Sequence, residues 1–225
     1  MCRLRRNASY QDLHEDLGIA TSTAWNDHQT RVCFLAEVLG CPDEDGLAVL
    51  VAGRVCRVED TLVPTVNWRH RSDLRSGKHR RHGMNVGLLV DLHGQIILAS
   101  PAFPGSWHDG HRFREAGWVD LLHHADGGIG DLGYEDEPNV VHTPIKKRSN
   151  IDLCDHERQP TRTFARIRVS VEWRGGHLKN RRILATRYRS DLARIDTDIQ
   201  TTVGLHKLNE HFSGRPPTYD RIKTA

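Results

Sequence analysis

Three acidic residues of the sequence lie in local contexts that suggest phosphoryl chemistry: Asp60, Asp131 and Glu172. Separated carboxylates that converge in a fold can hold two divalent cations, the usual arrangement for in-line attack on a phosphodiester. The set therefore indicates chemistry on nucleic-acid strands. The alternative is that all three are surface acids, which is the favoured interpretation for any single Asp or Glu, and their spacing along the chain is weak evidence against it.

The three acids fall on three different expected elements. Alternating apolar and polar residues predict a strand over residues 54–60, which ends at the first aspartate. A short strand over residues 127–131 has to deliver the second aspartate, although its glycines weaken it. An amphipathic helix over residues 161–184 carries the glutamate. Side chains from three elements approach a site from different sides, as holding a pair of cations requires.

Between the first and second aspartates the pattern predicts a β-hairpin and a helix. Apolar stretches over residues 85–91 and 95–100 flank a short turn that contains Gly94. Residues 112–123 have the apolar spacing of an amphipathic helix.

Basic residues concentrate in two segments, residues 69–82 and 162–189, although the formal net charge is only +3. Local basic surface fits phosphate backbones, whose affinity comes largely from counterion release. On the expected helix, Arg168 and Lys179 share a face with Glu172, so carboxylate and cations can meet one phosphate region. Solvated surface is the alternative, which charge alone favours.

The N-terminal residues have the order of a helix-turn-helix. A helix from residue 10 ends at Gly18, where a turn needs positive φ. The next helix starts with candidate capping residues, and as the second helix of the motif it would read DNA. A third helix is expected over residues 30–39. A plain helical hairpin packed on the main domain is the alternative. The capping and DNA-contact candidates are Thr21, Ser22 and Thr23.

Length and composition favour a soluble cytoplasmic protein. The chain has 225 residues, enough for one or two domains with an ordinary core. Five scattered cysteines without a Cys-x-x-Cys pair indicate neither disulfides nor zinc. No apolar run approaches the roughly 20 residues of a membrane span. The fifteen histidines leave a general metal-dependent nuclease using His108 and His111 as a third interpretation.

Five motifs follow one another along the chain, at residues 58–64, 76–86, 99–109, 131–134 and 165–172. In this order they resemble a bacterial insertion-sequence transposase of the DDE type, in the branch related to Harbinger-like elements. The resemblance extends from about residue 9 to residue 209. It implies an RNase H-like α/β fold, in which a mixed sheet has helices on both faces and gathers the acids at one edge, preceded by a small all-α helix-turn-helix module.

The resemblance also implies the roles of the three acids. Asp60 and Asp131 would be the catalytic aspartates and Glu172 the catalytic glutamate, together holding two Mg²⁺ or Mn²⁺ ions. The reaction would be hydrolysis at transposon ends, followed by attack of a 3′-hydroxyl on target DNA. The partners would be double-stranded DNA, as terminal inverted repeats and target, and further copies of the chain on that DNA in the bacterial nucleoid.

Motif matching extends the site to basic and polar neighbours. The first group lies in a loop that is close to the metal site in the family, so it is expected to contact backbone phosphate, with a solvated turn as the alternative. A His-Asp pair is expected to contact substrate or to support the metal ligands, with a loop-stabilising hydrogen bond as the alternative. The residues are Lys78, His79, Arg80, Arg81 and His82, and the pair His108 and Asp109.

Departures from the family pattern keep a catalytically decayed, DNA-binding remnant as the alternative function. Glycines precede Asp131, Gly175 and Gly176 lower helix propensity after Glu172, and the chain starts close to the helix-turn-helix, which suggests truncation. The expected organisation is a helix-turn-helix module over residues 1–41, a linker over 42–52, a catalytic domain over 53–212 and a tail over 213–225.

Overall fold

The computed structural model describes residues 2–40, 42–66, 70–145 and 178–212. Glu172 and Arg168 lie outside these residues, as does most of the expected helix over 161–184. No helix in the described part of the chain is both long enough and apolar enough to cross a membrane.

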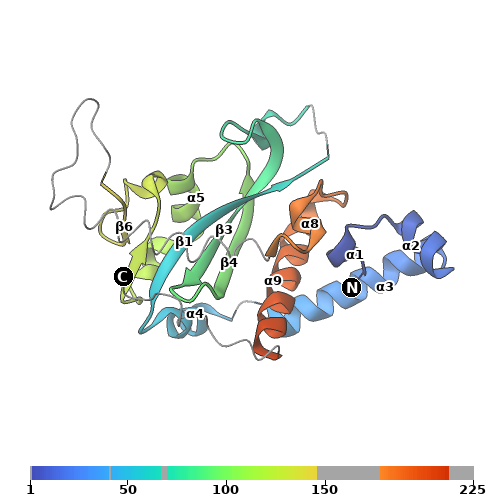
Figure 1. The fold of residues 1–225 in the computed structure, drawn as a ribbon, viewed down its shortest axis with the longest axis horizontal. Helices are drawn as coiled ribbons and strands as arrows, with labels where there is room; N and C mark the ends of the chain where they lie inside the picture. Colours follow the sequence, from blue (N-terminus) through green and yellow to red (C-terminus); the bar gives the residue numbers. More distant parts are fainter. Residues whose placement is uncertain (1, 41, 67–69, 146–177, 213–225) are drawn as a thin grey trace, which may run out of the picture.

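The centre of the molecule is a mixed β-sheet (Figure 1). Strand β1 (Val55–Pro64) pairs antiparallel with β3 (Arg81–Asp91), and β3 pairs antiparallel with β4 (Ile96–Pro104). On the other side of β1, strand β5 (Gly127–Ile129) runs parallel to it, followed by the parallel strand β6 (Val141–His142). A two-residue strand, β2 (Arg75–Ser76), pairs with the start of β3. This arrangement, with helices on both faces, confirms the predicted RNase H-like α/β fold.

The two faces of the sheet bury separate hydrophobic clusters, because successive residues of a strand point to opposite faces. On β3, Val86, Leu88 and Val90 join the cluster under helix α9 (Ile195–Phe212). Leu89 joins the opposite cluster instead. That second cluster includes residues from helices α4 (Glu44–Val51), α5 (Asp109–Glu115) and α6 (Trp118–Leu122).

The N-terminal helices reach the rest of the protein through different partners. Helices α1 (Cys2–Arg6) and α2 (Tyr10–Leu17) precede α3 (Thr21–Leu39), which packs on α9 and lies alongside it (Figure 1). Helix α2 packs on α3, and α1 packs on α8 (Arg182–Ala185). Gly18 ends α2 with a φ of 66°, as the sequence predicts. The capping prediction is wrong, since Ala20 is the N-cap of α3 and Thr21, Ser22 and Thr23 form its exposed first turn.

Several predicted boundaries also differ from the structure. The separate helix over residues 30–39 is wrong, because α3 is one continuous helix. The expected linker over 42–52 contains α4, whose N-cap Asp43 accepts a hydrogen bond from the Gly46 N–H. The helix over 112–123 is divided into α5 and α6 by Gly117, which has a φ of 70°. The hairpin with Gly94 in its turn is confirmed.

The remaining described elements are short. The expected helix over 161–184 does not continue to its predicted end, because residues 179–181 form a turn before α8. These elements are helix α8 (Arg182–Ala185) and the 3-10 helices η1 (Ser72–Leu74), η2 (Leu132–Tyr134) and η3 (Leu192–Arg194).

Candidate active site

Asp60 lies on the face of β1 that α5 and α6 cover. Alternation along the strand places it on the same face as Cys56 and Val58, which are buried in the cluster with Phe113 and Trp118. The Asp60 side chain is 14% exposed. The apolar part of the strand therefore anchors the residue, and its carboxylate lies at the solvent end of the same face.

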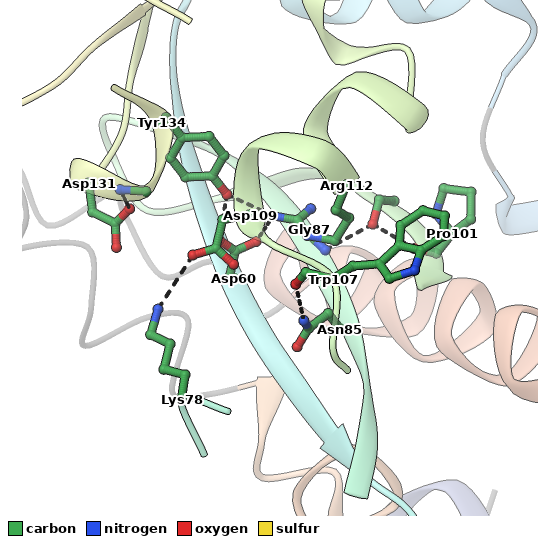
Figure 2. Close-up of polar contacts among 12 residues, drawn as sticks. Asp60, Lys78, Asn85, Gly87, Pro101, Trp107, Asp109, Arg112, Asp131 and Tyr134 are labelled. Carbon is green, nitrogen blue, oxygen red and sulfur yellow. Dashed lines mark hydrogen bonds and ion pairs between the residues drawn. The ribbon is translucent and has the colours of Figure 1, made fainter. Parts of the chain in front are cut away.

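Strand β1 continues to Pro64, past the predicted end at Asp60, so Asp60 lies within the strand. Asp131 lies beside it, just after the end of β5. The parallel register aligns Arg57 of β1 with Ile129 of β5, and the two aspartates follow three and two residues later. Asp131 is the N-cap of η2, and its Oδ1 accepts a hydrogen bond of 2.8 Å from the Gly133 N–H. Figure 2 shows the two carboxylates on neighbouring segments of the chain.

The glycines before Asp131 allow the close packing of β5. A Cβ on Gly128 would lie 2.2 Å from the carbonyl oxygen of Val140, and one on Gly130 would lie 2.7 Å from Val141. A side chain at either position would therefore force β5 and β6 apart. The glycine-rich segment forms the strand that the sequence predicts, over Gly127–Ile129.

Two buried side chains contact the Asp60 carboxylate. Arg112 of α5 forms an ion pair with Oδ1, and the Tyr134 hydroxyl donates a hydrogen bond of 2.5 Å to Oδ2. Arg112 also donates to the Tyr134 hydroxyl oxygen at 2.7 Å (Figure 2). Burial lowers the pKa of Arg112 and raises that of Tyr134. Sequence reasoning did not identify either residue, although Tyr134 belongs to the motif that contains Asp131.

Asp109, at the start of α5, faces Asp131 across Gly133. The point where a Cβ on Gly133 would lie is 2.8 Å from Asp109 Oδ2 and 2.9 Å from Asp131 Oδ1. The Lys78 Nζ lies 3.6 Å from the same Asp109 oxygen. The structure thus brings four polar residues of the sequence prediction to one edge of the sheet: Asp60, Lys78, Asp109 and Asp131.

The other predicted contact residues are spread more widely. The predicted residues of the basic loop, Lys78 to His82, lie in the turn over 77–80 and at the start of β3. Within this loop, burial lowers the pKa of His79. His108 is exposed as the N-cap of α5, and Lys179 is exposed in the turn before α8. The three candidates at the start of α3 belong to a helix that packs on α9, the helix over the opposite face of the sheet from Asp60.

The donor atoms at this edge fit a hard divalent cation. Asp60 Oδ1 is buried, and apart from its ion pair with Arg112 it has no hydrogen-bond partner in the described residues. Gly133 leaves space between two further carboxylates, and carboxylate oxygens are the ligands that Mg²⁺ and Mn²⁺ prefer. Glu172, the third expected ligand, lies outside the described residues.

A complete metal-binding group is not formed by the described residues alone. Within them, no set of three or more His, Cys, Asp or Glu side chains is placed to hold an ion. The same finding counts against a histidine site built on His108 and His111. The His111 ring instead packs against Trp107, with 4.3 Å between the ring centroids.

The chain matches a known protein family over most of this domain. A family model described as DDE superfamily endonuclease matches residues 60–207, a segment that includes both aspartates. No curated protein and no solved structure matches the chain.

Proposed function

The chain belongs to the DDE superfamily of endonucleases, since the family match covers more than half of it, and we propose that it is the DNA transposase of a bacterial insertion sequence. In this proposal it hydrolyses phosphodiester bonds at the ends of its element. The 3′-hydroxyl that is released then attacks target DNA. Several copies of the chain act together on the two ends.

The observation that carries the proposal is the parallel pairing of β1 with β5. This register brings Asp60, within β1, close to Asp131, which follows β5, although the two residues are far apart in sequence. Together with Glu172 they are the proposed ligands for Mg²⁺ or Mn²⁺. When bound, a pair of such ions supplies polarisation of the attacking and leaving oxygens of a phosphodiester.

The side chains around the aspartates provide the rest of the proposed DNA site. The Lys78 side chain is 63% exposed while it remains paired with Asp109, so its charge is available to a phosphate beside the acids. The basic turn over residues 77–80 extends this positive surface. His108, at the start of α5, is a further proposed contact to double-stranded DNA. The first turn of α3 is proposed as a separate DNA contact, because α3 packs on α9 over the other face of the sheet.

The proposal is tested by cleavage of the element's terminal inverted repeats with Mg²⁺ or Mn²⁺. The parent protein should nick the ends, and Asp60→Asn, Asp131→Asn and Glu172→Gln should each abolish nicking. Asp126→Asn is a matched control, because this exposed residue precedes the same strand that Asp131 follows. Nicking that survives in all three variants would show that the assignment is wrong.

A second candidate function is a decayed transposase that only binds DNA. It is favoured by the engagement of both Asp60 oxygens by Arg112 and Tyr134. This alternative predicts sequence-specific binding of the ends without cleavage under any divalent ion. Binding with cleavage in the same preparation excludes it.

A further inference from the structure

The strand next to β1 has a glycine, and so no side chain, directly beside Asp60. In the antiparallel register of β1 and β3, Asp60 lies opposite Gly87. A Cβ on Gly87 would lie 2.1 Å from Arg112 Nη1 and 2.6 Å from the Trp118 ring. The missing side chain therefore makes room for the Arg112 guanidinium, which extends over Gly87 to the aspartate (Figure 2).

Arg112 is fixed in this position by its surroundings. Its side chain is 0% exposed, and its guanidinium carbon lies 5.8 Å from the centre of the Trp118 ring. Its Nε and Nη1 have no hydrogen-bond partner among the described residues, so its polar contacts come from Asp60 and Tyr134. Because its side chain has no exposed surface and pairs with Asp60, Arg112 belongs to the surroundings of the carboxylate.

Tyr134 holds the other oxygen of the same carboxylate. The ring is 1% exposed and packs edge-on against Phe113, with 5.5 Å between the centroids. Its hydroxyl donates to Asp60 Oδ2 and accepts from Arg112. An ionised carboxylate has about four lone-pair sites. With one contact on each oxygen, Asp60 keeps acceptor capacity for a cation.

We infer that Arg112 and Tyr134 are positioning residues that orient the Asp60 carboxylate for binding a divalent cation. The inference rests on the proposed function, since it assigns Asp60 to the metal site. Partners that hydrogen-bond to a metal-binding side chain fix its orientation before the ion arrives, and their loss costs about 10- to 100-fold in metal affinity. Arg112 also offsets the repulsion between Asp60 and the neighbouring carboxylates.

The test is direct binding of Mn²⁺ to the DNA-free full chain, measured by titration calorimetry. Tyr134→Phe removes only the hydroxyl and keeps the ring packed, and we expect it to weaken Mn²⁺ binding about 10-fold. Tyr188→Phe is the matched control. Tyr188 is also 1% exposed, and its hydroxyl donates to a different carboxylate, that of Asp198, at 2.8 Å. This control should bind Mn²⁺ as the parent does.

Three results would overturn the inference. Equal Mn²⁺ binding by Tyr134→Phe and the parent would overturn this inference and leave the proposed function standing. Tighter Mn²⁺ binding by Tyr134→Phe would do the same, because it would show that the hydroxyl competes with the ion for Asp60. A parent protein that binds no Mn²⁺ would contradict the proposed function as well.

Arg112→Lys gives a second readout, because it keeps the positive charge and loses the planar fork. If Arg112 positions the metal ligand, the Mn²⁺ concentration for half-maximal cleavage should rise about 10-fold, and excess Mn²⁺ should restore the maximal rate. If its role is only structural, the melting temperature falls and the half-maximal Mn²⁺ concentration stays the same. That result would overturn the inference for Arg112.

Discussion

Asp60 lies within β1 and Asp131 follows the end of β5 beside it, and the two residues differ in what surrounds them. Asp60 contacts a fully buried guanidinium and a buried hydroxyl, whereas Asp131 accepts a hydrogen bond from a backbone N–H in a 3-10 turn. Removing one partner of a buried ion pair leaves the other charge uncompensated. The same chemical change at the two aspartates should therefore have different effects on stability.

We predict that Asp60→Asn lowers the free energy of unfolding by about 3 kcal/mol, because Arg112 loses its counter-charge. Asp131→Asn should change it by less than about 0.5 kcal/mol, because the amide oxygen can still accept the Gly133 N–H. Urea unfolding of the two variants and the parent measures both values. Equal losses of stability in the two variants would show that the ion pair between Asp60 and Arg112 adds nothing to the stability of the fold.

For single residues, the sequence predicts the acidic side chains of the site better than the side chains that contact them. Asp60, Asp131 and Asp109 are identifiable because their motifs are local in sequence. Arg112 and Gly87 are not, because their roles depend on register: Gly87 matters only once it lies opposite Asp60. The roles of Glu172 and Arg168 stay predictions, since both lie outside the described residues.

At the scale of elements, β5 is the short strand that positions a proposed ligand. It has three residues and pairs with β1 on one side and β6 on the other. Gly127→Ala and Gly128→Ala form a matched pair within it. A Cβ on Gly127 meets no described atom within 4 Å, whereas one on Gly128 meets the Val140 carbonyl at 2.2 Å.

We predict that Gly128→Ala lowers the free energy of unfolding by about 2 kcal/mol and reduces metal-dependent cleavage, because overpacking separates β5 from β6. Gly127→Ala should have little effect on either. Denaturant unfolding and a nicking assay on both variants check the prediction. Equal effects of the two substitutions would show that β5 needs glycine for its backbone flexibility and not for close packing against β6.

Helix α3 carries a buried histidine against α9. His28 Nε2 lies 3.7 Å from Asp198 Oδ1, and Tyr188 donates to the other oxygen of that carboxylate. Burial, reinforced by the charges of Arg3 and Arg194, lowers the pKa of His28 to about 4. Burial raises the pKa of Asp198.

The lowered pKa of His28 makes stability depend on pH. Below about pH 6.5 the unfolded chain takes up a proton on this residue while the folded protein does not, so stability falls as the pH falls towards 4. The raised pKa of Asp198 acts in the opposite sense and reduces the net change. We predict that, through His28, the free energy of unfolding falls by about 1 to 2 kcal/mol when the pH is lowered from about 7 to about 5.

Urea unfolding of the parent and of His28→Asn at the two pH values measures this contribution. The variant should lose less stability than the parent on acidification. An equal loss in both proteins would assign the pH dependence to other groups.

The same elements show how far helix boundaries follow from sequence. Apolar spacing alone does not locate helix ends, so it predicts neither the break at Gly117 nor the continuity of α3. Packing accounts for the continuity of α3: the Thr201 hydroxyl of α9 donates to the Val32 carbonyl, and Gly204 brings α9 close to Leu39.

Across the whole molecule, the N-terminal helices and the endonuclease sheet share a hydrophobic core. Leu4 of α1 and Val32 of α3 belong to the same buried cluster as Val63 of β1 and Val86 of β3. The helix order around Gly18 agrees with the sequence, but a DNA-reading role for α3 stays a prediction. The mixed sheet was predictable because the resemblance fixes strand order, which local patterns do not.

The central claim is that Asp60 and Asp131 form a metal-dependent site for phosphodiester cleavage. The most direct measurement is the rate of Mn²⁺-dependent nicking of the element's ends by the parent and by Asp131→Asn, with both proteins shown to be equally stable. The account predicts nicking by the parent and a loss of at least about 100-fold in the variant. Equal rates in the two proteins would contradict it.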